Sequence, residues 1–294
     1  MALPAVFVTG GNAGIGAAAC KELVADRGCR VFMGSRSMEK GKQTVRNMEL
    51  GDKEINITVV ECDVQSDESV REAAAKVREA LGEQKLFGLV NNAGLGQGQP
   101  DRAVIETNFY GPRRVCDNFL PMMDSKNGRV VNVGSGIGPG FVRNLSDVDV
   151  KRQLCSASTT FEELEALMNR LLEGDTFGSE PMEVAPPGRA EKALIPFSYG
   201  LSKAGLAAYS MQLARENPDI MVSCVDPGFI STNMSKGLGA TKPPEEGTVS
   251  IMRCLFQDLP ASGLFYGSDG LRSPLHTPRY PGQKEYDGAP PVLQ

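Results

Sequence analysis

Residues 5–35, "AVFVTGGNAGIGAAACKELVADRGCRVFMGS", contain two short apolar runs on either side of a stretch of helical length. Each run is rich in Val and Phe and leads into glycine, which is typical of strands buried on both faces. The segment between them, "GAAACKELVADRG", predicts an amphipathic helix. Strand, helix and strand in succession predict a right-handed βαβ unit, and therefore a parallel sheet with helices on both faces.

The same alternation continues along the chain. Five more apolar runs follow: "INITVVECD" (55–63), "LFGLVNNAG" (86–94), "GRVVNVGS" (128–135), "IMVSCVDPG" (220–228) and "GLFYG" (263–267). Helical stretches such as "SDESVREAAAKVREALG" (66–82) lie between most of them. We therefore predict one doubly wound α/β domain over residues 1–294, with about seven strands. A chain that is 41% hydrophobic and 23% charged suits such a domain.

Composition excludes several classes of protein. The net charge of -5 gives no indication of a nucleic-acid partner, and no apolar run approaches the roughly 20 residues that span a bilayer. The amino terminus lacks the features of a signal peptide, and the carboxyl terminus carries no recognised address. Seven scattered cysteines without a C-x-x-C pair predict reduced thiols in a cytoplasmic protein, with no zinc site. The single histidine, His276, excludes a histidine metal cluster, so acid–base chemistry needs another source.

One segment, residues 139–196, interrupts the alternation where a short link is expected. It contains "TTFEELEALMNRLLEG" (159–174), which predicts a helix with one apolar stripe: Phe161, Leu164, Leu167, Met168, Leu171 and Leu172. Either Thr159 with Glu162 or Thr160 with Glu163 can form a capping box at its start. A loop is expected over 179–193, and residues 268–294 are expected to form an irregular tail.

The turn "TGGNAGIG" (9–16) joins the first strand to the first helix. Its glycines Gly10, Gly14 and Gly16 allow the backbone to approach a pyrophosphate, and the helix start offers free N–H groups to it. The alternative is a glycine-rich turn without a ligand. The position after the first strand of a βαβ unit favours the dinucleotide site.

The end of the second strand indicates which dinucleotide binds. NAD sites place an acid there to hold the ribose 2′-hydroxyl, but residues 28–38 contain no acid and include Arg36. An arginine binds a 2′-phosphate through its planar fork of donors, whereas an acid repels it. We therefore predict NADP(H), the alternative being a solvated surface arginine.

The stretch "PFSYGLSKAG" (196–205) places Tyr199 and Lys203 four residues apart, at the start of a helix after Pro196. Residues with this spacing lie on one face of a helix, so the phenol and the ammonium can meet. By itself this pattern also fits an ordinary surface pair.

Five motifs, "TGGNAGIG", "NNAG" (91–94), "VGS" (133–135), "YGLSK" (199–203) and "DPGFIST" (226–232), occur in this order. Together they resemble the short-chain dehydrogenase/reductases over roughly residues 5–266. The insertion and "ATKPPEEG" (240–247) look most like the monomeric NADPH-dependent carbonyl reductases. This resemblance implies a Rossmann-type fold and a catalytic tetrad of Asn108, Ser135, Tyr199 and Lys203. It also implies a substrate site at Ser135, Ile137, Tyr199 and Phe229.

The resemblance further implies a set of cofactor contacts. The expected residues are Gly10, Asn12, Ala13, Gly14, Ile15, Gly16, Arg36, Asp63, Val64, Asn91, Ala93, Gly94, Tyr199, Lys203, Pro227, Gly228, Ile230 and Thr232. Asp63 is expected to bind the adenine amino group. Three positions depart from the family pattern: Ala13 replaces a common basic residue, Phe229 a common tryptophan and Asn233 a common acid.

The tetrad explains how chemistry proceeds without histidine. The Lys203 ammonium and the positive ring of oxidised nicotinamide are expected to lower the pKa of Tyr199, which is near 10 in a free tyrosine. In reduction the tyrosine gives its proton to the carbonyl oxygen, Ser135 hydrogen-bonds that oxygen, and Asn108 holds a water that resupplies the proton.

Three functions remain open from the sequence. The first is an NADPH-dependent reductase of aldehydes and ketones. The second is a specialised reductase or dehydrogenase of a terpenoid, steroid, prostaglandin or alkaloid-like carbonyl, because pocket loops and not the fold set the substrate. The third, a non-catalytic NADP(H)-binding regulatory protein, predicts a damaged tetrad, and all four positions are filled by the expected types.

The apolar stripe of the insertion predicts the state of assembly. It either docks a partner protein or packs on its own domain. In many family members the tyrosine helix and the helix before it form the subunit interface. If the insertion covers that face, the protein is a monomer that binds only a small-molecule substrate.

Overall fold

The computed structural model describes residues 2–180, 182–184 and 193–289. Its main sheet has eight strands in the order β10-β9-β8-β5-β4-β1-β2-β3. These strands are β1 (Ala5–Val8), β2 (Arg30–Ser35), β3 (Ile57–Glu61), β4 (Leu86–Asn91), β5 (Arg129–Val133), β8 (Met221–Val225), β9 (Leu264–Tyr266) and β10 (Arg272–Ser273). All neighbours pair in parallel except β10, which pairs antiparallel with β9. The doubly wound fold is confirmed.

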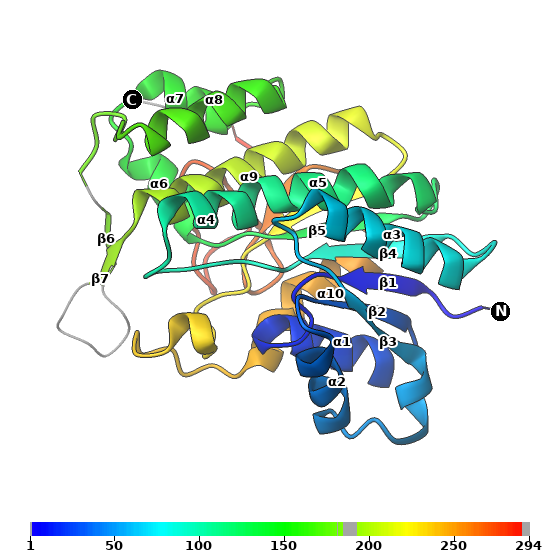
Figure 1. The fold of residues 1–294 in the computed structure, drawn as a ribbon. Helices are drawn as coiled ribbons and strands as arrows, with labels where there is room; N and C mark the ends of the chain where they lie inside the picture. Colours follow the sequence, from blue (N-terminus) through cyan, green and yellow to red (C-terminus); the bar gives the residue numbers. More distant parts are fainter. Residues whose placement is uncertain (1, 181, 185–192, 290–294) are drawn as a thin grey trace.

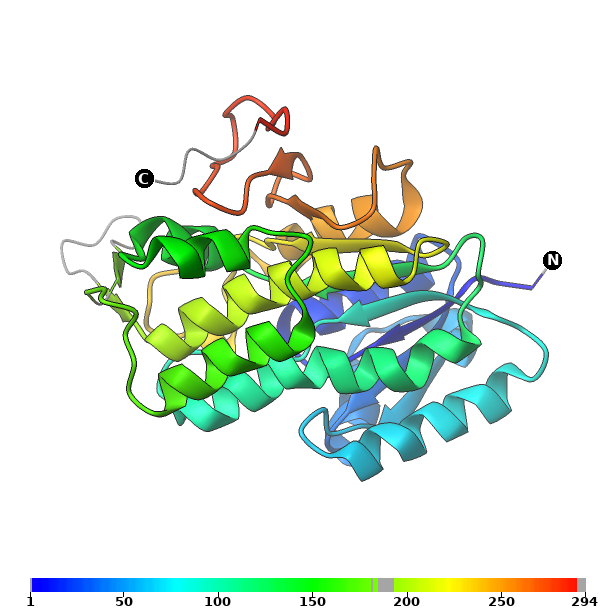
Figure 2. The same ribbon diagram turned by 90° about the horizontal axis from the view of Figure 1, so that it is seen from above.

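The seven expected strands all form, and β10 is the eighth. It arises where an irregular tail was expected, because Arg272 and Ser273 pair with Tyr266 and Phe265 at the sheet edge. Two residues are too short for a periodic signal in the sequence. The remaining described tail, up to Ala289, is irregular and folds beside this edge (Figure 2).

Helices cover both faces of the sheet, as Figure 1 shows. One face carries α3 (Asp67–Leu81), α4 (Asp101–Ile105), α5 (Gly111–Phe119) and α9 (Phe197–Glu216); the other carries α1 (Gly14–Ala25), α2 (Met38–Asn47) and α10 (Val249–Phe256). Short helical turns are η1 (Gly51–Asn56), η2 (Glu106–Tyr110, a π-helix), η3 (Leu120–Met122), η4 (Asn233–Ser235) and η5 (Pro244–Thr248). Each face has its own buried apolar core. No helix in the described ranges has the length and apolar character needed to cross a bilayer.

The insertion holds more structure than the single expected helix. It contains α6 (Ile137–Asn144), α7 (Val148–Leu154), α8 (Phe161–Leu172) and an antiparallel pair of short strands, β6 (Met182–Val184) and β7 (Ala193–Ile195). The expected loop over 179–193 was therefore wrong at β6, and its middle lies outside the described residues. Apart from α8, these elements have three to eight residues each, which is too short for periodicity to identify them.

Helix α8 lies across α9, as expected for a stripe that packs on its own domain (Figure 1). The Thr160–Glu163 capping box forms at its start, while the Thr159 hydroxyl donates to the Gln153 carbonyl instead. The stripe residues Leu164, Leu167, Met168 and Leu171 are buried. A Cβ placed on Gly205 of α9 would lie 2.3 Å from the Met168 Cε, so the two helices meet closely there.

Candidate active site

The expected site residues meet at one edge of the sheet. Strands β8, β5, β4 and β1 are neighbours in parallel, so the loops that follow them lie side by side at the carboxyl ends of the strands. Ligands of doubly wound sheets bind in the crevice at this edge. Segments near residues 10, 94, 135 and 228 are thereby brought together with the start of α9.

The turn between β1 and α1 is shaped for close approach of a ligand. Gly10 and Gly14 have positive φ angles of 62° and 52°, which favour glycine. A Cβ on Gly16 would lie 2.4 Å from the Gly10 carbonyl oxygen. Helix α1 begins after Ala13 without a side-chain cap and without an acid in its first turn. Its first N–H groups are therefore not capped by a side chain, which fits a bound phosphate.

Three residues outside the predicted set hold this turn in place. The Thr9 hydroxyl accepts hydrogen bonds from the N–H groups of Asn92 and Ala93, both at 3.0 Å. The Asn92 side chain donates to the carbonyls of Thr9 and Gly10, and the Thr44 hydroxyl donates to the Asn12 carbonyl at 2.9 Å. Thr9 and Asn92 stand inside the quoted motifs "TGGNAGIG" and "NNAG", which is the signal that could have identified them.

Arg36 lies exposed immediately after β2, beside the start of α2. In the part of the chain that the structure describes, it has no ion pair or hydrogen bond. Its guanidinium donors are therefore free for an anion at this edge. That fits the 2′-phosphate of NADP(H).

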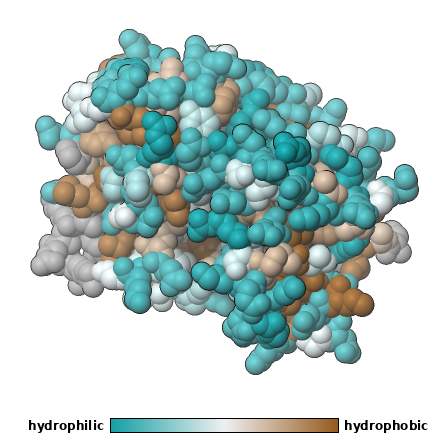
Figure 3. Space-filling model, viewed as in Figure 1, coloured by the Kyte–Doolittle hydropathy of each residue, from teal (hydrophilic) through white to brown (hydrophobic). Residues whose placement is uncertain are grey.

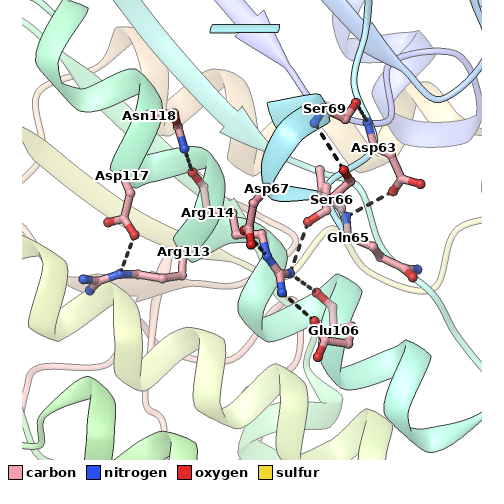
Figure 4. Close-up of polar contacts among 11 residues, drawn as sticks. Asp63, Gln65, Ser66, Asp67, Ser69, Glu106, Arg113, Arg114, Asp117 and Asn118 are labelled. Atoms are coloured by element: carbon pink, nitrogen blue, oxygen red, sulfur yellow. Dashed lines mark hydrogen bonds and ion pairs between the residues drawn. The ribbon is translucent and has the colours of Figure 1, made fainter. Parts of the chain in front are cut away.

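Asp63 and Val64 follow β3 in different environments. One Asp63 carboxylate oxygen accepts a hydrogen bond from the Gln65 N–H at 3.1 Å, and the carboxylate stays partly exposed (Figure 4). Val64 is buried against Gly111. Beside them, Arg114 of α5 pairs with Asp67 at 2.8 Å and with Glu106 at 2.7 Å, which joins α5 to the start of α3 (Figure 4). Only Asp63 offers its side chain at the surface of this edge.

The residues at the end of β4 and directly after it also differ in exposure. The Asn91 side chain is buried in the sheet, where its amide donates to Asn132 at 2.8 Å. It therefore braces β4 against β5 and does not present its side chain at the edge. Ala93 and Gly94 are partly exposed, and a Cβ on Gly94 would lie 3.7 Å from the Lys203 Nζ.

Tyr199 and Lys203 lie one turn apart on α9, with the Lys203 Nζ 5.9 Å from the centre of the Tyr199 ring. The lysine is buried, and its ammonium donates to the Val133 carbonyl at 2.8 Å. Burial lowers the pKa of Lys203 to about 8, while the charges of Cys224 and Asp226 oppose that fall. The pair is therefore not an ordinary surface pair.

Ser135 completes the arrangement from the end of β5. Its Oγ accepts a hydrogen bond from the Ile137 N–H at 3.2 Å, which leaves the hydroxyl proton available for donation. A hydrogen bond between Ser135 and the Tyr199 phenol lowers the pKa of Tyr199, but burial raises it more strongly and Asp226 adds to the rise. In the protein alone the pKa of Tyr199 is therefore raised, because desolvation of the phenolate outweighs the effect of Ser135. The expected lowering, which also involves the oxidised nicotinamide, stays a prediction.

Asn108 is the fourth tetrad residue and lies in the π-helical turn η2. Its side chain accepts from the Leu95 N–H at 2.8 Å and donates to the Leu95 carbonyl at 2.9 Å and to Ser202 at 3.2 Å. These bonds join the loop after β4 to α9. The described contacts thus show a side chain that braces two elements, and they do not test the expected water.

The loop after β8 closes the other end of the site. Gly228 has a φ angle of 87°, and a Cβ on Gly14 would lie 3.0 Å from Thr232. Ile230 is buried and forms a bridge with Lys242, while Phe229 is 39% exposed. This loop therefore runs from the Ser135 side of the site to the glycine turn. Within the described ranges, no group of three or more His, Cys, Asp or Glu side chains is placed to hold a metal ion.

Comparisons with known proteins agree with this geometry. Residues 4–146 match the family model for short chain dehydrogenases. The chain is 32% identical to (+)-neomenthol dehydrogenase of Arabidopsis thaliana, covering 88% of this chain and 94% of that one. It is 30% identical to human carbonyl reductase (NADPH) 1, covering 82% and 86%.

The fold is similar to the structure of salutaridine reductase from Papaver somniferum, with a TM-score of 0.74, 25% identity, and coverage of 90% of this chain and 99% of that one. The tyrosine, lysine, serine and asparagine lie together at the carboxyl edge of a doubly wound sheet, and the identities extend over most of both chains. The chain therefore belongs to the short-chain dehydrogenase/reductase family.

Proposed function

We propose that the protein reduces aldehydes and ketones, quinones included, to alcohols with NADPH. The observation that carries this proposal is the placement of Tyr199 and Lys203 one turn apart on α9, with the Lys203 Nζ 5.9 Å from the centre of the Tyr199 ring, next to Ser135 at the edge where a dinucleotide binds. The third possibility from the sequence, a non-catalytic binding protein, predicts that this arrangement is broken. All four tetrad positions are instead filled by the expected residue types, and Tyr199 and Lys203 lie one turn apart on α9.

NADP(H) is the cofactor that the residues fit. The uncapped start of α1 and the glycine turn suit its pyrophosphate, and Arg36 suits its 2′-phosphate. The human relative, carbonyl reductase (NADPH) 1, supports the same choice. When bound, this cofactor supplies the hydride that is added to the carbonyl carbon.

The side chains of this chain supply the proton and the orientation. Because burial raises the pKa of Tyr199, the phenol keeps its proton at neutral pH and is suited to donate it to the carbonyl oxygen. Ser135 hydrogen-bonds the same oxygen, because its Oγ accepts from the Ile137 N–H and its proton stays available for donation. Lys203 supplies positive charge as the phenolate forms, and Asn108 keeps the loop after β4 in place.

A second candidate is a specialised reductase of a terpenoid or alkaloid-like ketone. The relatives named neomenthol dehydrogenase and salutaridine reductase suggest it. One feature favours it: Phe229, Met234 and Leu194 are exposed apolar side chains on the segments beside the site. Met234 lies against Gly96, and Gln97 donates to the Leu194 carbonyl, so these segments border the loop after β4.

The test is a steady-state screen of quinones, simple aldehydes, and cyclic terpenoid and alkaloid ketones with NADPH and with NADH. We expect turnover with NADPH, and Tyr199→Phe should reduce it by about three orders of magnitude or more while NADPH still binds. Near-normal turnover in Tyr199→Phe contradicts the mechanism. Turnover confined to cyclic terpenoid or alkaloid ketones favours the second candidate.

We also propose a cytoplasmic location, because all seven cysteines are free thiols and six of them are buried.

A further inference from the structure

Asp226 is an acidic residue beside the tetrad that the mechanism above does not use. It follows β8 directly, opposite the segment that leaves β5 toward Ser135. Its backbone is fixed on both sides: its N–H donates to the Tyr266 carbonyl at 2.8 Å, and its carbonyl accepts from the Ser250 hydroxyl at 3.1 Å. The side chain is therefore held in one place at the base of the site.

The Asp226 carboxylate lies between two loops of the site. It accepts a hydrogen bond from the N–H of Gly228 at 3.0 Å and lies close to Gly136, whose N–H lowers its pKa. A Cβ on Gly136 would lie 2.9 Å from the Asp226 Oδ2. Gly136 follows Ser135 and is the last residue before α6. The start of α6 has no side-chain cap. One carboxylate thus joins the Ser135 loop, the start of α6 and the Pro227–Gly228 loop.

Opposing influences act on the pKa of this carboxylate. Each hydrogen-bond partner that the described residues offer its side chain is an N–H donor, and none is an acceptor for a carboxyl proton. Burial, the largest influence, and the nearby Asp269 raise the pKa of Asp226 above its usual range, and the N–H groups of Gly228 and Gly136 and the charge of Lys203 only partly oppose this rise. Asp269 itself is paired with the buried guanidinium of Arg279 from the tail, so its charge is offset.

We propose that Asp226 is a positioning residue of this site, whose carboxylate ties the Ser135 loop to the Pro227–Gly228 loop and holds Lys203 in its charged form. Its role in catalysis rests on the proposed function. This tie fixes the position of the Ser135 hydroxyl relative to the Pro227–Gly228 loop, on the other side of the reacting carbonyl. The negative charge offsets the desolvation of the lysine and opposes loss of a proton from the Tyr199–Lys203 pair.

The first test compares Asp226→Asn with the wild type in NADPH-dependent reduction. The substitution keeps the size of the side chain and removes its charge. We expect kcat to fall about tenfold, as for one lost charge-assisted hydrogen bond, with a KM for NADPH that changes less than about threefold. The alkaline limb of the pH profile should move to lower pH, because the Tyr199–Lys203 pair loses its first proton more easily. An unchanged kcat and an unchanged alkaline limb overturn the proposal.

The second test does not need turnover. The titration of Lys203 is followed by NMR in protein labelled at lysine Cε, with Lys203→Arg to assign the signal. In Asp226→Asn the midpoint should fall by roughly half a pH unit or more below that of the wild type. The matched control is Asp219→Asn, which removes an exposed acid beyond the other end of β8 and should leave the midpoint unchanged. Other titratable neighbours of the pair, Cys224 and Asp269, are the same in both variants.

An unmoved Lys203 midpoint in Asp226→Asn overturns the proposal, whatever the kinetics show. If the wild type reduces no carbonyl with NADPH, the proposed function fails, and the NMR titration still decides the role of the Asp226 charge. The two failures are therefore distinguishable.

A third variant tests the tie from the opposite side. Gly136→Ala adds a methyl group 2.9 Å from the Asp226 Oδ2, so it should lower kcat in the wild-type background and much less in the Asp226→Ala background. Equal effects in both backgrounds contradict the contact. Gly136→Ala also serves if Asp226→Asn does not fold.

Discussion

At the scale of the residue, Lys203 shows how a reactive group lowers the stability of the fold that holds it. Its side chain is 5% exposed, and burial lowers its pKa from 10.5 to about 8. The unfolded chain therefore binds this proton more tightly than the folded one. The resulting penalty is fully present below about pH 8 and is relieved as the pH rises from about 8 to 10.5.

We expect Lys203→Met to raise the free energy of unfolding at pH 7 by roughly 2 kcal/mol. About 3 kcal/mol follows from the pKa shift, and about 1 kcal/mol is lost with the hydrogen bond to the Val133 carbonyl. Denaturant unfolding at pH 7 and near pH 10 checks this, because the gain should disappear at the higher pH. If Lys203→Met destabilises the protein equally at both pH values, burial of the Lys203 ammonium does not lower the free energy of unfolding. Turnover should be lost in either case.

Arg36 is expected to set the preference between NADPH and NADH. Arg36→Asp should raise the KM for NADPH tenfold or more and shift preference toward NADH, because a charge-assisted contact is replaced by repulsion. Arg46→Asp, on the exposed face of the neighbouring helix α2, is the matched control for a change in net charge and should leave the preference unchanged. An unaltered KM for NADPH in Arg36→Asp would place the 2′-phosphate elsewhere.

At the scale of the element, the π-helical turn η2 explains how Asn108 reaches two partners. A π-helical turn adds a residue to the helix and changes the direction of its side chains, and such turns occur often at functional sites. Here the turn aims the Asn108 amide at the backbone of Leu95 and at Ser202. The element therefore links the loop after β4 to the helix that carries Tyr199.

Helix α8 depends on its capping box. We expect Thr160→Ala to lower the free energy of unfolding by about 1 kcal/mol, because the Glu163 N–H loses its acceptor at 3.2 Å. Thr160→Ser keeps the hydroxyl and should restore most of the loss. Thermal or denaturant unfolding of both variants makes the comparison, and a loss of equal size in Thr160→Ser would assign the effect to the methyl group.

At the scale of the whole molecule, the insertion covers the outer face of α9. The buried stripe of α8, together with the stacking of Phe161 against Phe109 and its edge contact with Tyr209, occupies that face. The outer side of α8 carries Glu162, Glu163 and Arg170, and the upper edge of the molecule is mainly hydrophilic in Figure 3. A surface of this kind does not favour a stable protein interface.

We therefore expect a monomer in solution. Light scattering at micromolar concentration should give a mass near 31.5 kDa. The same measurement on Leu164→Asp, which places a charge in the interface between α8 and α9, should show partial unfolding or self-association. A stable dimer or tetramer of the wild type would mean that another face associates.

The amino-acid sequence by itself determined the layers of the fold and most of the site. Short apolar runs ended by glycine predict the seven strands, because strands buried on both faces carry this signal within four to six residues. The motifs around Gly14, Ser135 and Tyr199 predict which strand ends meet. The stripe of α8 predicts its packing, since an apolar face needs a surface to cover.

Only the tertiary structure decided how these groups affect one another. The two-residue strand β10, the β6–β7 pair and the bracing role of Asn91 depend on neighbours that are distant in sequence. Burial raises the pKa of Tyr199 in the protein alone, and this could not be read from the lysine four residues away, because desolvation depends on every atom packed around the phenol. Asp226 stands in a quoted motif, yet its place between Gly136 and Gly228 follows only from the pairing of β8 with β5. Local sequence patterns specify the helices and strands. Burial and electrostatics at a site depend on all the residues that the fold packs around it.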